Sequence, residues 1–205
     1  MSPPTDATTT FRRPGGRRGR ARLTTLLDAA EALVVDGDVD AITLDAVAER
    51  ASLPLSTVRA QADDVRALFD QLVLRLLDRH DAVLNRALPT EPEPLVEVAA
   101  GVYDTYVAHY RAVPAFRALR CSSRFTDRHR EWFDRRVRRM LIRVQSRTVP
   151  TNLTVEQLRI PWTVADAMLE AAFRHEPDGD PVLIDEGRAL VRNSVERLVT
   201  ATAAV

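Results

Sequence analysis

The chain has 205 residues, of which 45% are hydrophobic and 28% charged, and 29 acidic residues balance 29 basic ones. This composition indicates a soluble globular protein of one or two domains, and the neutral total by itself gives no indication of a nucleic-acid partner. The single cysteine excludes an intrachain disulfide, and no apolar run reaches the roughly 18 residues that cross a bilayer. The arginine-rich start lacks the apolar segment of a signal peptide. We therefore expect a cytoplasmic protein.

Residues 1–18 are expected to form a disordered basic arm, because they are rich in proline, glycine and threonine and poor in large apolar side chains. Every basic residue of the chain is an arginine, and residues 1–22 carry a net charge of +5. The N-terminal segment is therefore cationic although the net charge of the whole chain is zero.

The spacing of apolar and capping residues predicts four helices in the first part of the chain. They span residues 19–35, 44–51, 55–61 and 63–88. Gly37 ends the first helix, Thr43 caps the second, and Pro54 fits the first turn of the third. Asp63 and Asp64 cap the fourth helix. Two very short helices after a longer one have the proportions of a helix-turn-helix.

A proline-rich break at Thr90–Pro94 separates these helices from a second helical region. The predicted helices of this region cover residues 95–111, a short segment from Pro114, residues 126–147, a segment opened by a capping box at Thr154–Gln157, and residues 181–203. Pro161 is expected to kink or restart the fourth of them. No long segment alternates with the two-residue period of a strand, so the sequence predicts an all-α fold.

The N-terminal segment resembles the signature of the TetR family of bacterial transcriptional regulators. The resemblance is carried, in register and without gaps, by residues 26–33, Gly37, Thr43, 47–51 and 66–69. It implies a three-helix helix-turn-helix DNA-binding domain over residues 19–64. It also implies a helical effector-binding and dimerisation domain over residues 65–205, which includes the connecting fourth helix at 65–88. Residues 184–191 resemble the final helix of many members.

The resemblance implies that the third helix is the recognition helix, with Val58 toward the core and these residues toward DNA: Ser56, Thr57, Arg59, Ala60 and Gln61. Arg59 is expected to read guanine and Gln61 adenine, each through two hydrogen bonds. Thr43, at a helix start, is placed to bind a phosphate. Four arginines near the N-terminus are expected either to attract DNA regardless of its sequence or to enter its minor groove: Arg17, Arg18, Arg20 and Arg22.

Five positions depart from the residues usual in the family. Ser52 replaces a glycine, Pro54 a serine, and Val65 a lysine that meets a DNA phosphate at the start of the fourth helix. Arg59 and Ala62 replace an aromatic pair. These departures leave a second interpretation open, a TetR-like dimer that binds ligands or proteins and has lost specific DNA binding.

In the family, a cavity for a small effector lies among the helices of the second region, where the aromatic residues of this chain are concentrated. The residues expected to line it are Tyr103, Tyr106, Tyr110, Phe116, Trp132, Phe133 and Trp162, with His109 as a polar contact. Ordinary core packing is the alternative for each ring.

Residues 117–147 hold eleven arginines and three acids, a net charge of +8. This density indicates an anionic effector, a patch for another macromolecule, or a solvated helix face balanced by acids elsewhere. Glu91, Glu93 and Glu97 are the acids expected to balance it.

The resemblance as a whole implies a homodimer, paired through its last two helices, that binds a near-palindromic operator on double-stranded DNA. A small molecule would release the operator, so a repressor is the expected function. We expect no enzyme activity, cofactor, metal site or membrane contact. Ser122, Asp127 and His129 are close in sequence, but helical spacing alone does not align a nucleophile, a base and an orienting acid. A small helical enzyme that uses His129 is the third interpretation.

Overall fold

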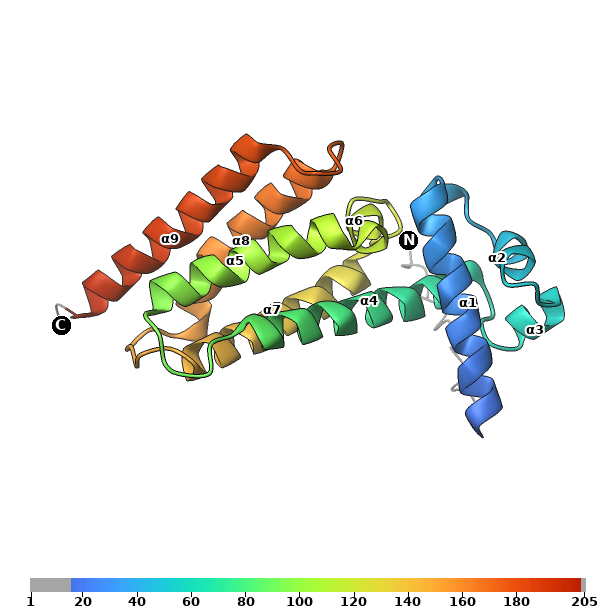
Figure 1. Ribbon diagram of the computed structural model, residues 1–205, viewed down its shortest axis with the longest axis horizontal. Coiled ribbons are helices and arrows are strands. Elements are labelled where there is room, and N and C mark those ends of the chain that lie inside the picture. Colours follow the sequence, from blue (N-terminus) through green and yellow to red (C-terminus); the bar gives the residue numbers. More distant parts are fainter. Residues whose placement is uncertain (1–15, 204–205) are drawn as a thin grey trace, which may run out of the picture. The chain divides into compact units, whose positions relative to one another are not determined.

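The computed structural model describes residues 16–203, and most of these residues are helical (Figure 1). The α-helices of the described part are α1 (Gly16–Asp36), α2 (Leu44–Arg50), α3 (Leu55–Arg59), α4 (Val65–Ala87), α5 (Leu95–Ala112), α6 (Pro114–Arg120), α7 (Asp127–Ser146), α8 (Val155–Phe173) and α9 (Pro181–Ala203). A 3-10 helix, Val39–Ala41, precedes α2. Within residues 16–203 the β pairing is limited to an isolated bridge between Glu93 and Thr148, so the all-α fold class is confirmed.

The chain divides into two compact units. Unit 1 comprises the residues up to Arg75 together with Ser122–Arg124, and unit 2 comprises Leu76–Cys121 and the residues from Phe125 onward. The division falls inside α4, so this helix contributes residues to both units. The functional boundary that we place at residues 64 and 65 remains a proposal.

Helix α1 begins at Gly16, three residues before the predicted start at Gly19. The prediction of a disordered arm is therefore wrong for residues 16–18, and residues 1–15 of the expected arm lie outside the described residues. Arginine has a high helix propensity, so Arg17 and Arg18 extend the helix although their side chains are exposed.

A tight turn between α2 and α3 makes the helix-turn-helix of unit 1. The backbone N–H of Ser52 donates to the carbonyl of Glu49 at 3.0 Å. The N–H of Leu53 donates to the carbonyl of Ala48, also at 3.0 Å. These two hydrogen bonds form a Schellman motif, which requires a left-handed residue, and Ser52 has a φ of +51°. The glycine usual in the family adopts this conformation without the steric cost of a Cβ atom.

We expect Ser52→Gly to raise the free energy of unfolding by about 1 kcal/mol, because it removes the Cβ strain at a positive φ. Urea unfolding at a fixed protein concentration measures this change. Ser56→Gly is the matched control: Ser56 lies inside α3, where the same chemical change lowers helix propensity and stability. A loss of stability in both variants would contradict the strain at Ser52.

Helix α8 continues through Pro161 instead of restarting there, so the predicted restart is wrong. Proline removes one backbone hydrogen bond, but Leu158, Trp162 and Ala165 around it are buried and hold the helix in place. The predicted capping box is confirmed, since Thr154 and Gln157 hydrogen-bond reciprocally.

In unit 2, α5 and α9 approach each other closely at Gly187, and α8 lies beside α9 (Figure 1). A Cβ atom at Gly187 would lie 2.9 Å from Cζ of Tyr103. The Tyr103 hydroxyl donates to the carbonyl of Ile184 at 3.0 Å. Tyr103 therefore joins α5 to α9, which is a structural role.

Candidate functional site

The short helix α3 presents one face to solvent and anchors the other in unit 1. Val58 has no exposed surface, whereas Ser56, Arg59 and Ala60 are exposed and Thr57 is half-buried. The helix ends at Arg59, two residues earlier than predicted, and Ala60 caps it. The expected recognition face is thus accessible at Ser56, Arg59 and Ala60.

Gln61 lies beyond the end of α3 and is half-buried. Its Oε1 atom is buried and has no hydrogen-bond partner among the described residues. The expected two-point contact with adenine requires this amide to turn outward, whereas the expected base contact of Arg59 starts from an exposed side chain.

Thr43 caps α2 as predicted, since its Oγ1 accepts the backbone N–H of Ala46 at 3.2 Å. Thr43 is exposed at the start of α2, where the expected phosphate contact is accessible. The arginines expected to attract DNA all lie exposed on the first turns of α1: Arg17, Arg18, Arg20 and Arg22.

The other departures from the family pattern have local consequences. Pro54 is the N-cap of α3 and provides no side-chain cap, which a serine would provide. Ala62 is buried in unit 1, where its small side chain fits.

The predicted cap of α4 is confirmed for Asp64, whose carboxylate accepts the N–H of Ala67 at 2.8 Å.

Unit 2 contains a buried group of rings that comes from five helices, α4 to α8. We call it the ring cluster, and its members are His80, Tyr106, His109, Tyr110, Phe116, Phe133 and Trp162. His80 is at its centre, with ring centroids 4.2 Å from Tyr106 and 4.7 Å from His109. Trp162 packs on Tyr106 at 4.9 Å. The cluster therefore brings together six of the eight residues expected to contact the effector.

Three nitrogen atoms of the ring cluster are buried and have no hydrogen-bond partner among the described residues. They are Nε2 of His80, Nε2 of His109 and Nε1 of Trp162. Buried polar atoms are nearly always paired in folded proteins, so unpaired ones mark a place where a ligand or water fits. Burial lowers the pKa of His109 to about 4. Burial also lowers the pKa of His80, and the nearby His109, Arg120 and Arg136 lower it further.

Both histidines are therefore neutral at pH 7, which leads to a prediction for acid stability. Below pH 6.5 the unfolded chain binds a proton at His109 that the folded protein does not bind until about pH 4. The contribution of His109 to the free energy of unfolding is then at its full value above pH 6.5, and it falls as the pH is lowered toward 4. At roughly 1.4 kcal/mol per pKa unit, His109 accounts for up to roughly 3 kcal/mol of this fall.

Urea unfolding measured from pH 7.5 to pH 4 checks this expectation, with His109→Phe as the test variant and His175→Ala as the control, since His175 is exposed. The His109 variant should show a flatter pH profile than the control. Equal slopes in the two variants would contradict a buried neutral His109.

Arg120 and Asp166 form an ion pair beside the ring cluster that the sequence did not indicate. Nη2 of Arg120 lies 2.7 Å from Oδ2 of Asp166, and Nε donates to the Tyr110 hydroxyl at 3.1 Å. The guanidinium also lies 4.2 Å from the ring centroid of Phe133. Arg120 is only 3% exposed, and burial opposes its charge, but Asp166 and Tyr110 raise its pKa above the ordinary value. The structure therefore adds three functional candidates: His80, Arg120 and Asp166. The helical spacing of the sequence marks them only as polar residues on helices.

Two of the expected effector residues lie elsewhere. Tyr103 joins α5 to α9, and Trp132 is half-buried on α7, where it contacts His129 and Arg128. His129 is itself buried, and its Nδ1 accepts the backbone N–H of Thr126, so this histidine caps α7.

Three arginines of α7 pair with acids of other helices, namely Arg130, Arg136 and Arg138, and Arg135 pairs with Glu131 within α7. Arg136 bonds to Asp78 and Asp81 of α4, and Arg138 lies 3.0 Å from Glu156. These partners differ from the expected ones, since Glu97 pairs with Arg192 instead. The structure thus favours a compensated helix face over an anion site at α7.

Residues 93–199, more than half of the chain, match the model of the tetracyclin repressor-like C-terminal domain. The chain belongs to the TetR family. A TetR-family transcriptional regulator from Streptomyces coelicolor is 29% identical, with a TM-score of 0.68 over 86% of this chain and 98% of that chain. A TetR transcriptional regulator from Rhodococcus sp. RHA1 is 16% identical, with a TM-score of 0.63 over 87% of this chain and 98% of that chain. No curated protein matches the chain.

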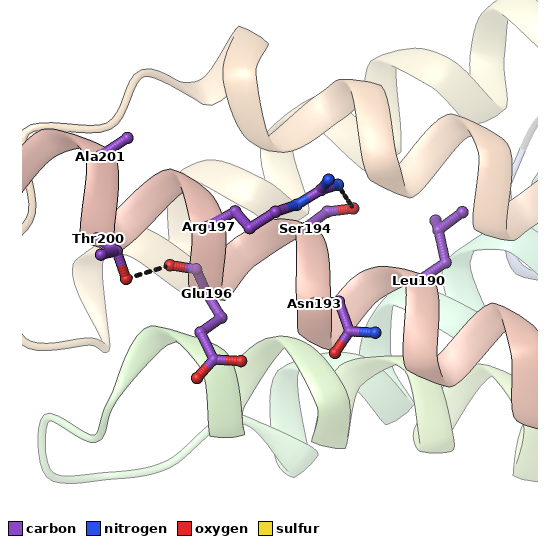
Figure 2. A pocket seen from close by; sticks show the side chains of 7 residues that line it. All are labelled: Leu190, Asn193, Ser194, Glu196, Arg197, Thr200 and Ala201. Carbon is purple, nitrogen blue, oxygen red and sulfur yellow. Dashed lines mark hydrogen bonds between the residues drawn. The ribbon is translucent and has the colours of Figure 1, made fainter.

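Regulators of the TetR family bind DNA and dimerise. In this TetR-family chain, α8 and α9 present an apolar groove of about 480 Å³, to which Ile160, Val164 and Leu198 contribute. Ile160 is 67% exposed. Figure 2 shows the adjoining face of α9, where Leu190 and other side chains line an open hollow of about 790 Å³.

None of the helices in residues 16–203 is long and apolar enough to cross a membrane. In the same residues, no group of three or more histidine, cysteine or acidic side chains is placed to hold a metal ion.

Proposed function

We propose that this TetR-family regulator is a repressor that binds a near-palindromic operator and releases it when a small molecule binds in unit 2. The observation that carries the proposal is the exposed face of α3, with Ser56 and Arg59 accessible and Val58 buried, on a helix-turn-helix. The Schellman turn at Ser52 supports the proposal, because it sets the angle between the two short helices.

Helix α4 provides a physical route for release. Its first half contributes Leu68 and Phe69 to the core of unit 1, and its second half contributes His80 to the ring cluster of unit 2. A ligand that displaces His80 therefore acts on a helix that is also packed in the DNA-binding unit. The ligand must bind the released state more tightly than the operator-bound state.

The proposed operator contact requires a dimer, since one copy reads only a half-site. The exposed apolar groove of α8 and α9 supports pairing through these two helices, as in the family. Two copies paired there would present their α3 helices to half-sites about 34–36 Å apart, or a multiple of this distance.

We expect Ile160→Asp to weaken the dimer by about 2 kcal/mol or more, roughly 30-fold, because it buries a charge in the apolar interface. Light scattering after size exclusion should then show a mass near 22.9 kDa, the mass of one chain. Ile142→Asp is the control, because Ile142 is 51% exposed on α7 and lies outside the groove. A dimer that survives Ile160→Asp would place the interface elsewhere.

A mobility-shift assay with genomic fragments from the source organism, repeated at rising salt, tests the proposed DNA binding. Retention of a few fragments in the presence of competitor DNA at high salt supports a specific operator. Weak, sequence-independent binding that salt abolishes would contradict it.

That second outcome favours a TetR-like dimer that has lost specific DNA binding. Two observations support this alternative. Val65 stands where the family has a phosphate-binding lysine, and the amide oxygen of Gln61 is turned inward.

A further inference from the structure

One face of α5 changes from apolar to polar along its length. Leu95, Ala99 and Val102 occupy successive turns and line a cavity. Tyr106 and His109 follow at the same helical spacing and belong to the ring cluster. At 1.5 Å per residue, the cavity lining extends about 10 Å along the helix before the polar end begins.

The cavity is narrow and lies between α5, α7, α8 and α9. Its volume is about 20 Å³, room for a group of about the size of one water molecule or one methylene. Apart from Trp162, the lining side chains are aliphatic, for example Leu141 and Val191, or belong to methionine and proline. Trp162 both lines the cavity and packs on Tyr106, so it connects the cavity to the ring cluster.

The polar end has hydrogen-bonding capacity without free positive charge. Nε2 of His80, Nε2 of His109 and Nε1 of Trp162 are buried and unpaired among the described residues. Arg120, the buried cation beside them, is already paired with Asp166 at 2.7 Å. The other carboxylate oxygen of Asp166 is buried and has no hydrogen-bond partner in the described part of the chain.

A carboxylate ligand would therefore meet two neutral histidines and a neighbouring acid instead of an available cation. A neutral end group meets one indole donor and two imidazole nitrogens, each of which donates or accepts according to its tautomer. The electrostatics of the buried site thus favour a neutral group over an anion.

We propose that the ring cluster and the adjoining cavity bind an elongated aliphatic compound with a neutral hydrogen-bonding end group, such as a primary amide, and discriminate against the corresponding carboxylate. His80, His109 and Trp162 hydrogen-bond the end group, and the hydrocarbon follows α5 toward Leu95. The narrow cavity must widen to admit the chain, and the end group contacts α4 through His80. This inference rests on the proposed function only for the ligand's role in releasing DNA.

Octanamide and octanoate are the matched probes, because they share a chain length and differ in charge at pH 8. Binding is measured on the full chain carrying Trp132→Phe, in which Trp162 is the remaining tryptophan and reports through its fluorescence. We expect octanamide to change the Trp162 emission saturably and to bind at least tenfold more tightly than octanoate. His109→Phe and His80→Phe, tested separately, should each weaken octanamide binding at least tenfold.

His175→Ala is the control, since it removes an exposed imidazole and should leave octanamide binding unchanged. Circular dichroism identifies any variant that does not fold, and the other histidine variant then serves as the test. Octanoate binding as tightly as octanamide, no binding of either probe, or full binding by the folded histidine variants would overturn the proposal.

A mobility-shift assay with the same probes separates this inference from the proposed function. Octanamide binding that leaves the DNA complex intact supports the ligand class and contradicts the release mechanism. Octanamide binding by a protein that retains no specific DNA fragment supports the ligand class and contradicts the repressor.

Discussion

Arg120→Ala is expected to lower the free energy of unfolding by about 3–5 kcal/mol, the largest effect of any substitution considered for unit 2. The arginine is 3% exposed, and its removal leaves the carboxylate of Asp166 buried without its cation. Burial already raises the pKa of Asp166, and Arg120 opposes this rise, so the variant should also bind a proton at Asp166. Urea unfolding at pH 7 and a fixed protein concentration measures the loss.

Two further variants make this prediction specific. Arg120→Met combined with Asp166→Asn should recover part of the loss, because no carboxylate is then buried without a partner. Arg188→Ala is the control: Arg188 pairs with Asp104 and Asp185 at the surface, and its loss should cost less than about 1 kcal/mol. If Arg120→Ala cost no more than Arg188→Ala, the buried pair would not stabilise unit 2.

Arg59→Ala is expected to lower operator affinity by roughly 2–6 kcal/mol, because each of two recognition helices loses a base contact of roughly 1–3 kcal/mol. Arg59 is exposed at the end of α3 and makes no hydrogen bond or ion pair with another described residue that would hold it away from DNA. Fluorescence anisotropy with a fragment selected from the source genome measures the change.

Arg135→Ala is the control for this experiment, since Arg135 is exposed on α7 and pairs only weakly with Glu131 at 3.8 Å. It removes the same charge from a different surface and should leave the affinity unchanged. A uniform weakening on all DNA sequences with a smaller salt slope would show that Arg59 contacts phosphate and does not read a base.

Helix existence and most helix boundaries follow from local signals in the sequence. Asp64 and Thr154 cap α4 and α8 as predicted, because a cap bonds a backbone N–H only three residues away. The errors occur where local signals compete: α1 starts early because arginine favours helix, and α8 passes Pro161 because its neighbours are buried.

The exposure of Ser56 and Arg59 was predictable for the same reason, since a five-residue helix that packs through Val58 turns part of its surface to solvent. The inward amide of Gln61 was not predictable, because it depends on where α3 ends and on what packs around the following turn.

By itself, the sequence determined the all-α class, the helix-turn-helix, the TetR resemblance and the aromatic character of the second region, because these depend on spacing along single helices. Only the tertiary structure decided that His80 of α4 meets His109 of α5, and that Arg120 is neutralised by Asp166 of α8. These contacts join residues up to 46 positions apart, and their chemistry depends on burial from water, which no periodicity along one helix encodes.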